Sequence, residues 1–201
     1  MPTAMERFIK VRETGLLDTL VSDGWLVPFS EIDASSAKLS HLKPALVLEH
    51  PALPFISYPY EWPFSVLKTA ALHHLRVHLR ALDHGVTLSD ATAYNIQFEG
   101  SKPKFIDHLS FIPLRAGEFW KGHRQFCEQF LNPLLLQAYL GVPHNAWFRG
   151  QLEGIPTSNL NDLLPLRRKL SPRVLMHITL PTRFQRKFSD ADSVNQIKSS
   201  K

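Results

Sequence analysis

Three oxygen-bearing side chains, Asp90, Asn95 and Asp107, are spaced as a phosphoryl-transfer site would require. Asp90 and Asn95 are separated by four residues, and Asp107 follows the short apolar run 104–106. In such a site one carboxylate accepts the proton of the attacking hydroxyl, while an amide oxygen and a second carboxylate hold Mg²⁺. The pattern therefore predicts Asp90 as the base, with Asn95 and Asp107 as the metal ligands. The alternative is that each residue only caps a turn, because Asp and Asn side chains readily bond nearby backbone amides.

The elements around these residues could bring them together. The segment from Pro63 to His84 lacks glycine and carries apolar residues at helical spacing, and Gly85 is a typical residue after a helix end. The residues expected to form the core stripe of this helix are Phe64, Leu67, Ala71, Leu75, Val77, Leu79 and Leu82. Residues 94–98 and 104–106 read as a hairpin around Gly100. Such a hairpin would bring Asp107 back beside the loop that holds Asp90.

The remaining pattern predicts an α+β protein that is mostly helical. Further helices are expected at 5–24, interrupted at Gly15, and at 118–140, with shorter ones at 160–170 and 174–180. Short strands are expected at 45–48 and 55–58, between prolines. Strands and helices do not alternate, which argues against a doubly wound parallel sheet.

Composition sets the broad class. The chain has 201 residues, of which 44% are hydrophobic and 20% charged, and a single cysteine, Cys127, expected to be buried and inert. It contains no run of 18 apolar residues and no apolar leader, so we expect a cytoplasmic protein without a membrane span.

Positive charge is concentrated at the C-terminal end. Residues 1–150 hold 14 basic and 14 acidic side chains, whereas residues 151–201 hold 9 basic and 4 acidic ones, a net charge of +5. A basic segment can bind nucleic acid. No recognisable nucleic-acid-binding motif accompanies it, so we expect a solvated tail and consider nucleic acid an unlikely partner.

The helix over 63–84 carries three histidines, His73, His74 and His78. His74 and His78 share a helix face, as two zinc ligands would, but no third ligand and no H-E-x-x-H pattern accompany them. Core or solvated histidines are therefore expected.

The catalytic pattern resembles the large lobe of the protein-kinase-like fold. The D-x-x-x-x-N spacing from Asp90 to Asn95 matches the kinase catalytic loop. The resemblance places Tyr60, Glu61 and Trp62 at the hinge, where they would bind the nucleotide. It implies a reduced small-lobe-like segment and hinge over 1–60, a large lobe over 61–185 and a flexible basic tail over 186–201. ATP and Mg²⁺ are the cofactors that it implies.

A closer resemblance covers roughly residues 10–185. The segments that carry it are 56–64 (ISYPYEWPF), 90–98 (DATAYNIQF), 105–111 (FIDHLSF) and 124–127 (RQFC). They are similar to the N-terminal portion of bacterial class I SAM-dependent methyltransferases of nodulation type. In that group this portion precedes a separate methyltransferase domain, which would be a partner of the present segment.

Two functions follow from these resemblances. The first is a kinase-like module that binds nucleotide and Mg²⁺, with phosphoryl transfer to an unknown acceptor. The alternative is an inactive kinase-like interaction module associated with a SAM-dependent methyltransferase, as part of a truncated member of that family. The chain departs from the kinase pattern in four ways: Leu88-Ser89 replaces His-Arg, His108-Leu109 replaces Phe-Gly, and both the glycine-rich loop and the small-lobe lysine are missing. No glycine-rich SAM loop occurs, so residues of this chain do not support SAM binding.

Overall fold

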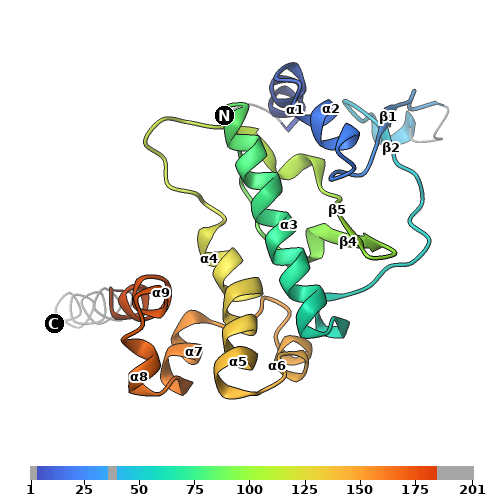
Figure 1. The fold of residues 1–201 in the computed structure, drawn as a ribbon. Coiled ribbons are helices and arrows are strands. Elements are labelled where there is room, and N and C mark those ends of the chain that lie inside the picture. Colours follow the sequence, from blue (N-terminus) through green and yellow to red (C-terminus); the bar gives the residue numbers. More distant parts are fainter. Residues whose placement is uncertain (1–3, 36–39, 185–201) are drawn as a thin grey trace, which may run out of the picture. The chain divides into compact units, whose positions relative to one another are not determined.

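The computed structural model describes residues 4–35 and 40–184, which form two compact units that divide after Phe126 (Figure 1). The first unit begins with α1 (Ala4–Glu13) and α2 (Leu16–Ser22). Gly15 separates these helices at a φ of 73°, a left-handed conformation that glycine adopts without steric cost. The interruption expected at Gly15 is therefore confirmed.

The long helix of the first unit is α3 (Phe64–Asp83), green in Figure 1, which confirms the helix predicted from Pro63 to His84. Its buried face is only partly the expected one. Leu67, Ala71 and Val77 are buried, but Leu79 and Leu82 are 63% and 36% exposed. Positions on the inner face are instead taken by His73, His74 and His78. The leucine stripe was wrong at those two positions because aromatic neighbours pack the imidazole rings in the core.

The predicted hairpin is confirmed as β4 (Ile96–Glu99) and β5 (Lys102–Phe105), which pair antiparallel with Ile96 opposite Phe105. A second antiparallel pair, β3 (Val86–Leu88) with β6 (Phe111–Pro113), was not predicted. Its strands are only three residues long and lie far apart in sequence. They are too short to show the alternation of apolar and polar residues that predicts a strand. This pairing matters for the site because Ser89, just after β3, donates from its backbone N–H to the carbonyl of Ser110, just before β6.

Among the described residues between α2 and α3, the regular elements are short. β1 (Ser30–Glu31) pairs antiparallel with β2 (Leu48–Glu49), and short 3₁₀ turns occupy Ser40–Leu42 and Pro59–Glu61. The strand expected at 45–48 is present only at its end. The strand expected at 55–58 is wrong, because the backbone groups of Ser57 bond to the side chain of Gln97 rather than to another strand.

The second unit is helical in its described part, which ends at residue 184. Its elements are a π-helical turn (Cys127–Leu131), α5 (Asn132–Leu140), α6 (Asn145–Gly150), α7 (Thr157–Leu163), α8 (Leu166–Lys169), α9 (Pro172–Val174) and a second π-helical turn (Leu175–Thr179). Their core gathers Leu136, Ile155, Leu160, Leu164, Val174 and Ile178. The last helix of the first unit is α4 (His123–Phe126). The helix predicted over 118–140 therefore begins at His123, five residues later than expected.

The kinase-like architecture stays a prediction, as do the predicted boundaries at residues 60 and 185. The predicted tail, 186–201, lies outside the described residues.

Candidate functional site

Two of the three predicted catalytic and metal-binding residues are in direct contact. Asn95 ends a 3₁₀ turn (Ala93–Asn95) before β4, and Asp107 precedes another (His108–Ser110) after β5. The hairpin register joins these turns, because the N–H of Ile106 donates to the carbonyl of Asn95 over 2.9 Å. The side-chain amide of Asn95 then donates to Oδ2 of Asp107 and to Oγ of Ser110, each over 3.2 Å.

The carboxylate of Asp107 accepts hydrogen bonds at both of its oxygens. Oδ1 accepts from the backbone N–H of Leu109 over 2.9 Å, which caps the 3₁₀ turn. Oδ2 accepts from the side-chain amide of Asn95 and from the hydroxyl of Ser110. These bonds hold the polypeptide after β5 in a fixed turn. Asp107 therefore caps a turn, which is the alternative to a role as metal ligand.

Asp90 lies in the same hydrogen-bonded group of loops, but its carboxylate serves its own turn. Oδ1 accepts from the N–H of Thr92 over 2.9 Å, a local Asx turn. The next residue, Ala91, donates its N–H to the side chain of Gln125 over 2.8 Å. The preceding residue, Ser89, bonds through its N–H and its hydroxyl to the carbonyl of Ser110. Ser110 therefore connects the loop of Asp90 to the turn of Asp107.

A pocket of about 430 Å³ lies beside Asp107. Its walls are largely apolar, and two imidazoles, His50 and His108, line it with ring centroids 4.8 Å apart. Burial, and then the neighbouring His50, lower the pKa of His108 to about 4, so this ring is neutral at physiological pH. Among the described residues, no group of three or more His, Cys, Asp or Glu side chains is arranged to hold a metal ion. Of the two predicted metal ligands, Asp107 lines this pocket and Asn95 does not.

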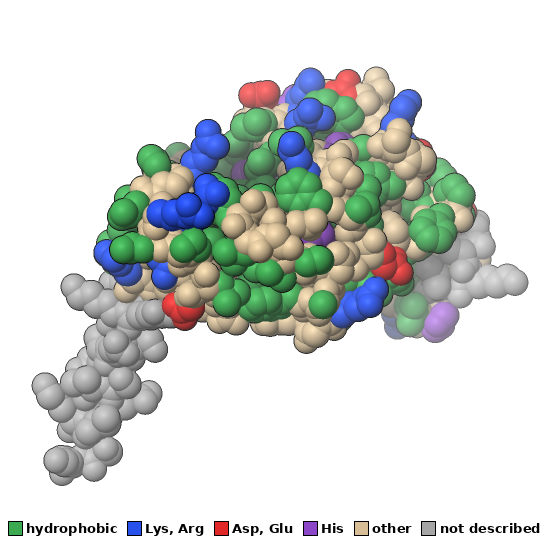
Figure 2. Space-filling view, turned by 60° about the horizontal axis from the view of Figure 1, so that its bottom comes forward, with side chains coloured by type: hydrophobic (Ala, Val, Ile, Leu, Met, Phe, Trp, Pro, Cys, Tyr) green, Lys and Arg blue, Asp and Glu red, His purple; other side chains and the backbone are tan. Residues whose placement is uncertain are grey.

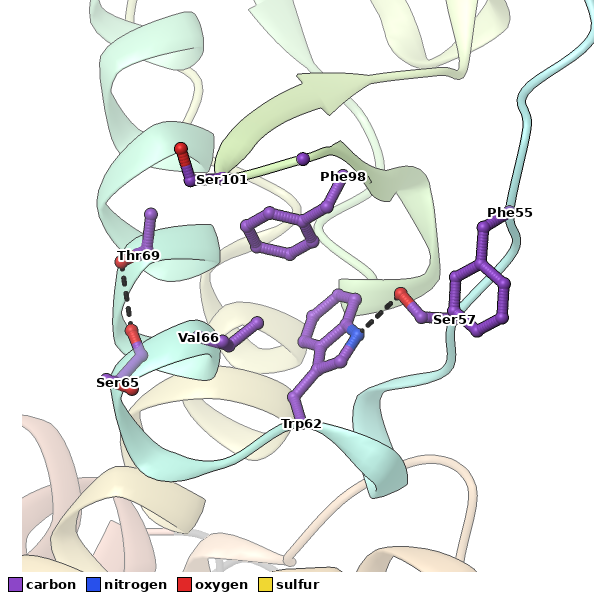
Figure 3. Close-up of a pocket in the computed structure, with 9 residues that line it drawn as sticks. Phe55, Ser57, Trp62, Ser65, Val66, Thr69, Phe98 and Ser101 are labelled. Atoms are coloured by element: carbon purple, nitrogen blue, oxygen red, sulfur yellow. Dashed lines mark hydrogen bonds between the residues drawn. The ribbon is translucent and has the colours of Figure 1, made fainter.

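The predicted hinge residues have clear structural tasks. Glu61 accepts the N–H of Tyr58 at Oε2 over 2.8 Å and so caps the turn Pro59–Glu61. Tyr60 stacks on Tyr58 with ring centroids 5.3 Å apart. Trp62 is only 3% exposed, and its indole N–H donates to the hydroxyl of Ser57 over 2.9 Å (Figure 3).

Gln97 is a site residue that the sequence did not indicate. It is 4% exposed, and its amide forms two hydrogen bonds to Ser57, accepting from the N–H and donating to the carbonyl, each over 3.0 Å. An adenine edge read by backbone groups needs the same pair, one donor and one acceptor. At Ser57 that pair is already occupied by a side chain of the same unit. No signal in the sequence could have shown it, because it depends on where β4 meets the segment before the turn.

The three histidines of α3 are buried, so of the two expected alternatives, core or solvated histidines, the core alternative is the one found. Nε2 of His73 donates to the carbonyl of Trp25 over 3.0 Å, and Nε2 of His78 lies 3.1 Å from the hydroxyl of Thr87. The ring of Trp120 lies 4.3 Å from that of His78 and 6.0 Å from that of His74. Burial lowers the pKa of all three histidines. The pKa of His74 falls to about 3, because the neighbouring His78 also disfavours its charged form.

The basic segment is described up to residue 184. There Arg167, Arg168 and Lys169 lie between two exposed apolar side chains, Leu166 at 72% and Leu170 at 67% exposure. Blue Lys and Arg side chains likewise stand among green hydrophobic ones on the face shown in Figure 2. That nucleic acid is an unlikely partner stays a prediction.

The remaining expectations concern the single cysteine and membrane-spanning helices. Cys127 is buried, as expected, and burial raises the pKa of its thiol to about 11, so it stays protonated and unreactive. Within residues 4–35 and 40–184, no helix is long and apolar enough to cross a membrane.

The comparisons with known proteins relate the chain to nodulation proteins. It is 53% identical over 166 residues to a relative from Rhizobium meliloti (strain 1021) described as "Nodulation protein NoeA". The match covers 83% of this chain but 35% of the relative, so the chain spans about a third of that protein. No family model matches the chain, and no solved structure matches it.

Proposed function

We propose that this chain is a non-catalytic domain of a nodulation-type protein, an interaction module that works beside a SAM-dependent methyltransferase. The similarity to NoeA supports the nodulation relation. The methyltransferase association rests on the resemblance of segments 56–64, 90–98 and 105–111 to the N-terminal portion of that family. The absence of a glycine-rich SAM loop from the sequence supports a role beside the methyltransferase rather than as one.

The observation that carries the non-catalytic assignment is the engagement of Asp107. Its Oδ2 accepts from both Asn95 and Ser110, and its Oδ1 accepts from Leu109. An oxygen that accepts two donors has both lone pairs engaged, so Mg²⁺ binding at Oδ2 would require breaking bonds that hold the turn.

A second candidate is the kinase-like nucleotide and Mg²⁺ site. The contact of Asn95 with Asp107 favours it, because these are the two predicted metal ligands. Two observations weigh against it. Gln97 bonds the backbone N–H and carbonyl of Ser57, three residues before the predicted hinge residue Tyr60, and the glycine-rich phosphate loop is absent from the sequence. An adenine recognised by the backbone of Ser57 would have to displace the buried amide of Gln97.

A thermal-shift titration with ATP, with and without Mg²⁺, separates the two candidates. A non-catalytic domain should show no Mg²⁺-dependent shift at millimolar nucleotide, whereas ligand at a hundred times its dissociation constant would stabilise by about 2.7 kcal/mol. A Mg²⁺-dependent shift in the wild type and in Asp90→Asn, but not in Asp107→Asn, would overturn the proposal and establish the metal site.

The methyltransferase association is tested separately. The chain is mixed with a polypeptide comprising the part of the Rhizobium protein outside the matched region, and the mixture is analysed by size-exclusion chromatography. We expect co-elution, and we expect calorimetry to detect no SAM binding to this chain alone. Separate elution would contradict the association, and SAM binding by the isolated chain would contradict the division of roles.

A further inference from the structure

A second pocket, of about 510 Å³, lies between the start of α3, the β4–β5 turn and the segment before Pro59 (Figure 3). Its volume is within the range of small-molecule sites in proteins. Its residues are Phe55, Ser57, Trp62, Ser65, Val66, Thr69, Phe98, Gly100 and Ser101. Neither the predicted metal ligands Asn95 and Asp107 nor Asp90 is among them.

The floor of this pocket is aromatic and held in place. Trp62 and Phe98 meet edge to face, with ring centroids 5.3 Å apart and an interplanar angle of 83°. The indole is fixed further by its hydrogen bond to Ser57, whose backbone is held by Gln97. Figure 3 shows these two rings at the centre, with Val66 on one side and Phe55 on the other. The floor is therefore formed in advance of any ligand.

The rim of the pocket exposes apolar surface to water. Phe55, a lining residue, is 71% exposed, and Ile56, which follows it in the sequence outside the lining, is 48% exposed. Large apolar side chains that gather at a pocket mouth mark a recognition site more often than a random surface does. Aromatic rings also favour edge-to-face contact with a further aromatic ring.

The lining excludes several ligand classes. None of the described lining residues is charged, so a phosphate or carboxylate entering the pocket would lose water without gaining an ionic partner. No carboxylate or carboxamide lines it either, although these groups usually bind sugar hydroxyls in pairs. The polar groups that remain are hydroxyls such as Ser65, Thr69 and Ser101, and Thr69 donates to the carbonyl of Ser65.

We propose that this pocket binds an uncharged aromatic small molecule of two or three rings, with the rings against Trp62 and Phe98. This site is additional to the function proposed above and does not depend on it. Hydroxyls at the rim can bond one polar group on the edge of the ligand, and Phe55 covers its outer side.

Fluorescence of N-phenyl-1-naphthylamine, an uncharged two-part aromatic probe, provides the test. We expect saturable enhancement by the full chain, displacement by 2-naphthol, and no displacement by 2-naphthoate or by ATP. Equal displacement by 2-naphthol and 2-naphthoate would overturn the requirement for an uncharged ligand. A lack of saturable enhancement would overturn the site itself.

Substitution on α3 locates the probe. Thr69 is exposed at the pocket wall, so Thr69→Trp fills the pocket without disturbing the core, and probe affinity should fall at least tenfold. The matched control is Lys68→Trp, at the neighbouring exposed position of α3 outside the lining, which should change affinity less than twofold. Circular dichroism confirms that both variants fold. Equal affinities in the two variants would mean that the probe binds elsewhere, and the proposal would fail.

Discussion

The side-chain amide of Asn95 donates to Oδ2 of Asp107 over 3.2 Å, across a hairpin that separates the two residues by twelve positions. The contact fixes the two ends of the hairpin relative to each other. Ser110 completes it by accepting from Asn95 and donating to Asp107. The same three side chains can be read as a metal site or as a lock on the hairpin, and these roles predict different responses to mutation.

Replacing Asp107 with alanine should destabilise the protein strongly if the carboxylate is a lock. The variant removes the acceptor of the N–H of Leu109 and of the hydroxyl of Ser110, and one of the two acceptors of the Asn95 amide. We expect a loss of about 2–4 kcal/mol in the free energy of unfolding, measured by urea denaturation without metal. Asp83→Ala, at the exposed C-terminal end of α3, is the control and should change stability by less than about 0.5 kcal/mol. Unchanged stability of Asp107→Ala would remove the structural role.

Gln97→Glu should produce a pH-dependent defect. A carboxylate cannot donate to the carbonyl of Ser57, and at 4% exposure it would be a buried charge facing that oxygen. Burial raises the pKa of such a carboxyl above its unfolded value of about 4.3, so stability is lost as the pH rises through this range. The deficit in melting temperature relative to wild type should be larger at pH 8 than at pH 4. Gln151→Glu, at an exposed position, should show no such trend.

The buried histidines should make the fold acid-sensitive. The pKa of His74 is about 3 and that of His108 about 4, against about 6.5 in the unfolded chain. Below pH 6.5 the unfolded chain therefore takes up protons that the folded chain does not. Stability is complete above pH 6.5 and falls as the pH drops, by about 2 kcal/mol per histidine at pH 5.

Melting temperatures between pH 7.5 and 5 measure this loss. His74→Phe keeps a ring among Phe105, Trp120 and Phe126 and should flatten the profile. Replacing the exposed His41 with glutamine should leave the wild-type slope intact. If the wild type melts at the same temperature across this range, the neutral buried cluster is refuted.

Gly154→Ala should be among the most damaging substitutions in the second unit. A Cβ there would collide with the backbone carbonyl of Glu128, which also accepts the N–H of Ile155 over 2.8 Å, and the φ of 91° adds strain. We expect a loss above about 3 kcal/mol by urea denaturation. Gly141→Ala isolates the backbone effect, because its φ of 68° is also left-handed but its Cβ would meet open space. That control should lose only about 1 kcal/mol. Equal losses would show that the close approach to Glu128 has no energetic weight.

The parts of this fold that the sequence predicted are those set by local patterns. The break at Gly15, the helix between Pro63 and Gly85 and the hairpin around Gly100 follow from glycine, proline and residue periodicity. Each depends on residues close together in the chain. Local pattern also sufficed to place Asn95 and Asp107 at facing turns, since the hairpin between them has a fixed register.

The parts that the sequence could not predict depend on long-range partners. The pairing of Leu88 with Phe111 and the hydrogen bonds from Gln97 to Ser57 join residues 23 and 40 positions apart. Likewise, Leu79 was expected in the core because it is apolar, whereas His78 occupies the inner face beside Trp120. A sequence reports hydrophobicity, but not which aromatic ring will cover an imidazole.

Phe105 has neighbours on both sides. β4 pairs with one edge of its strand, and on the other the N–H of Phe105 donates to the carbonyl of Trp25, while the N–H of Val27 donates to the carbonyl of Phe105. The segment after α2 therefore covers an edge that would otherwise offer free N–H and carbonyl groups to the strand of another molecule. Shortening the chain from its N-terminal side beyond residue 27 would uncover that edge at Phe105, the only large apolar side chain of β5. Two protections against strand addition therefore lie side by side: Lys102, Pro103 and Lys104 disfavour pairing within β5, and the segment from Trp25 to Val27 occupies the backbone groups of Phe105.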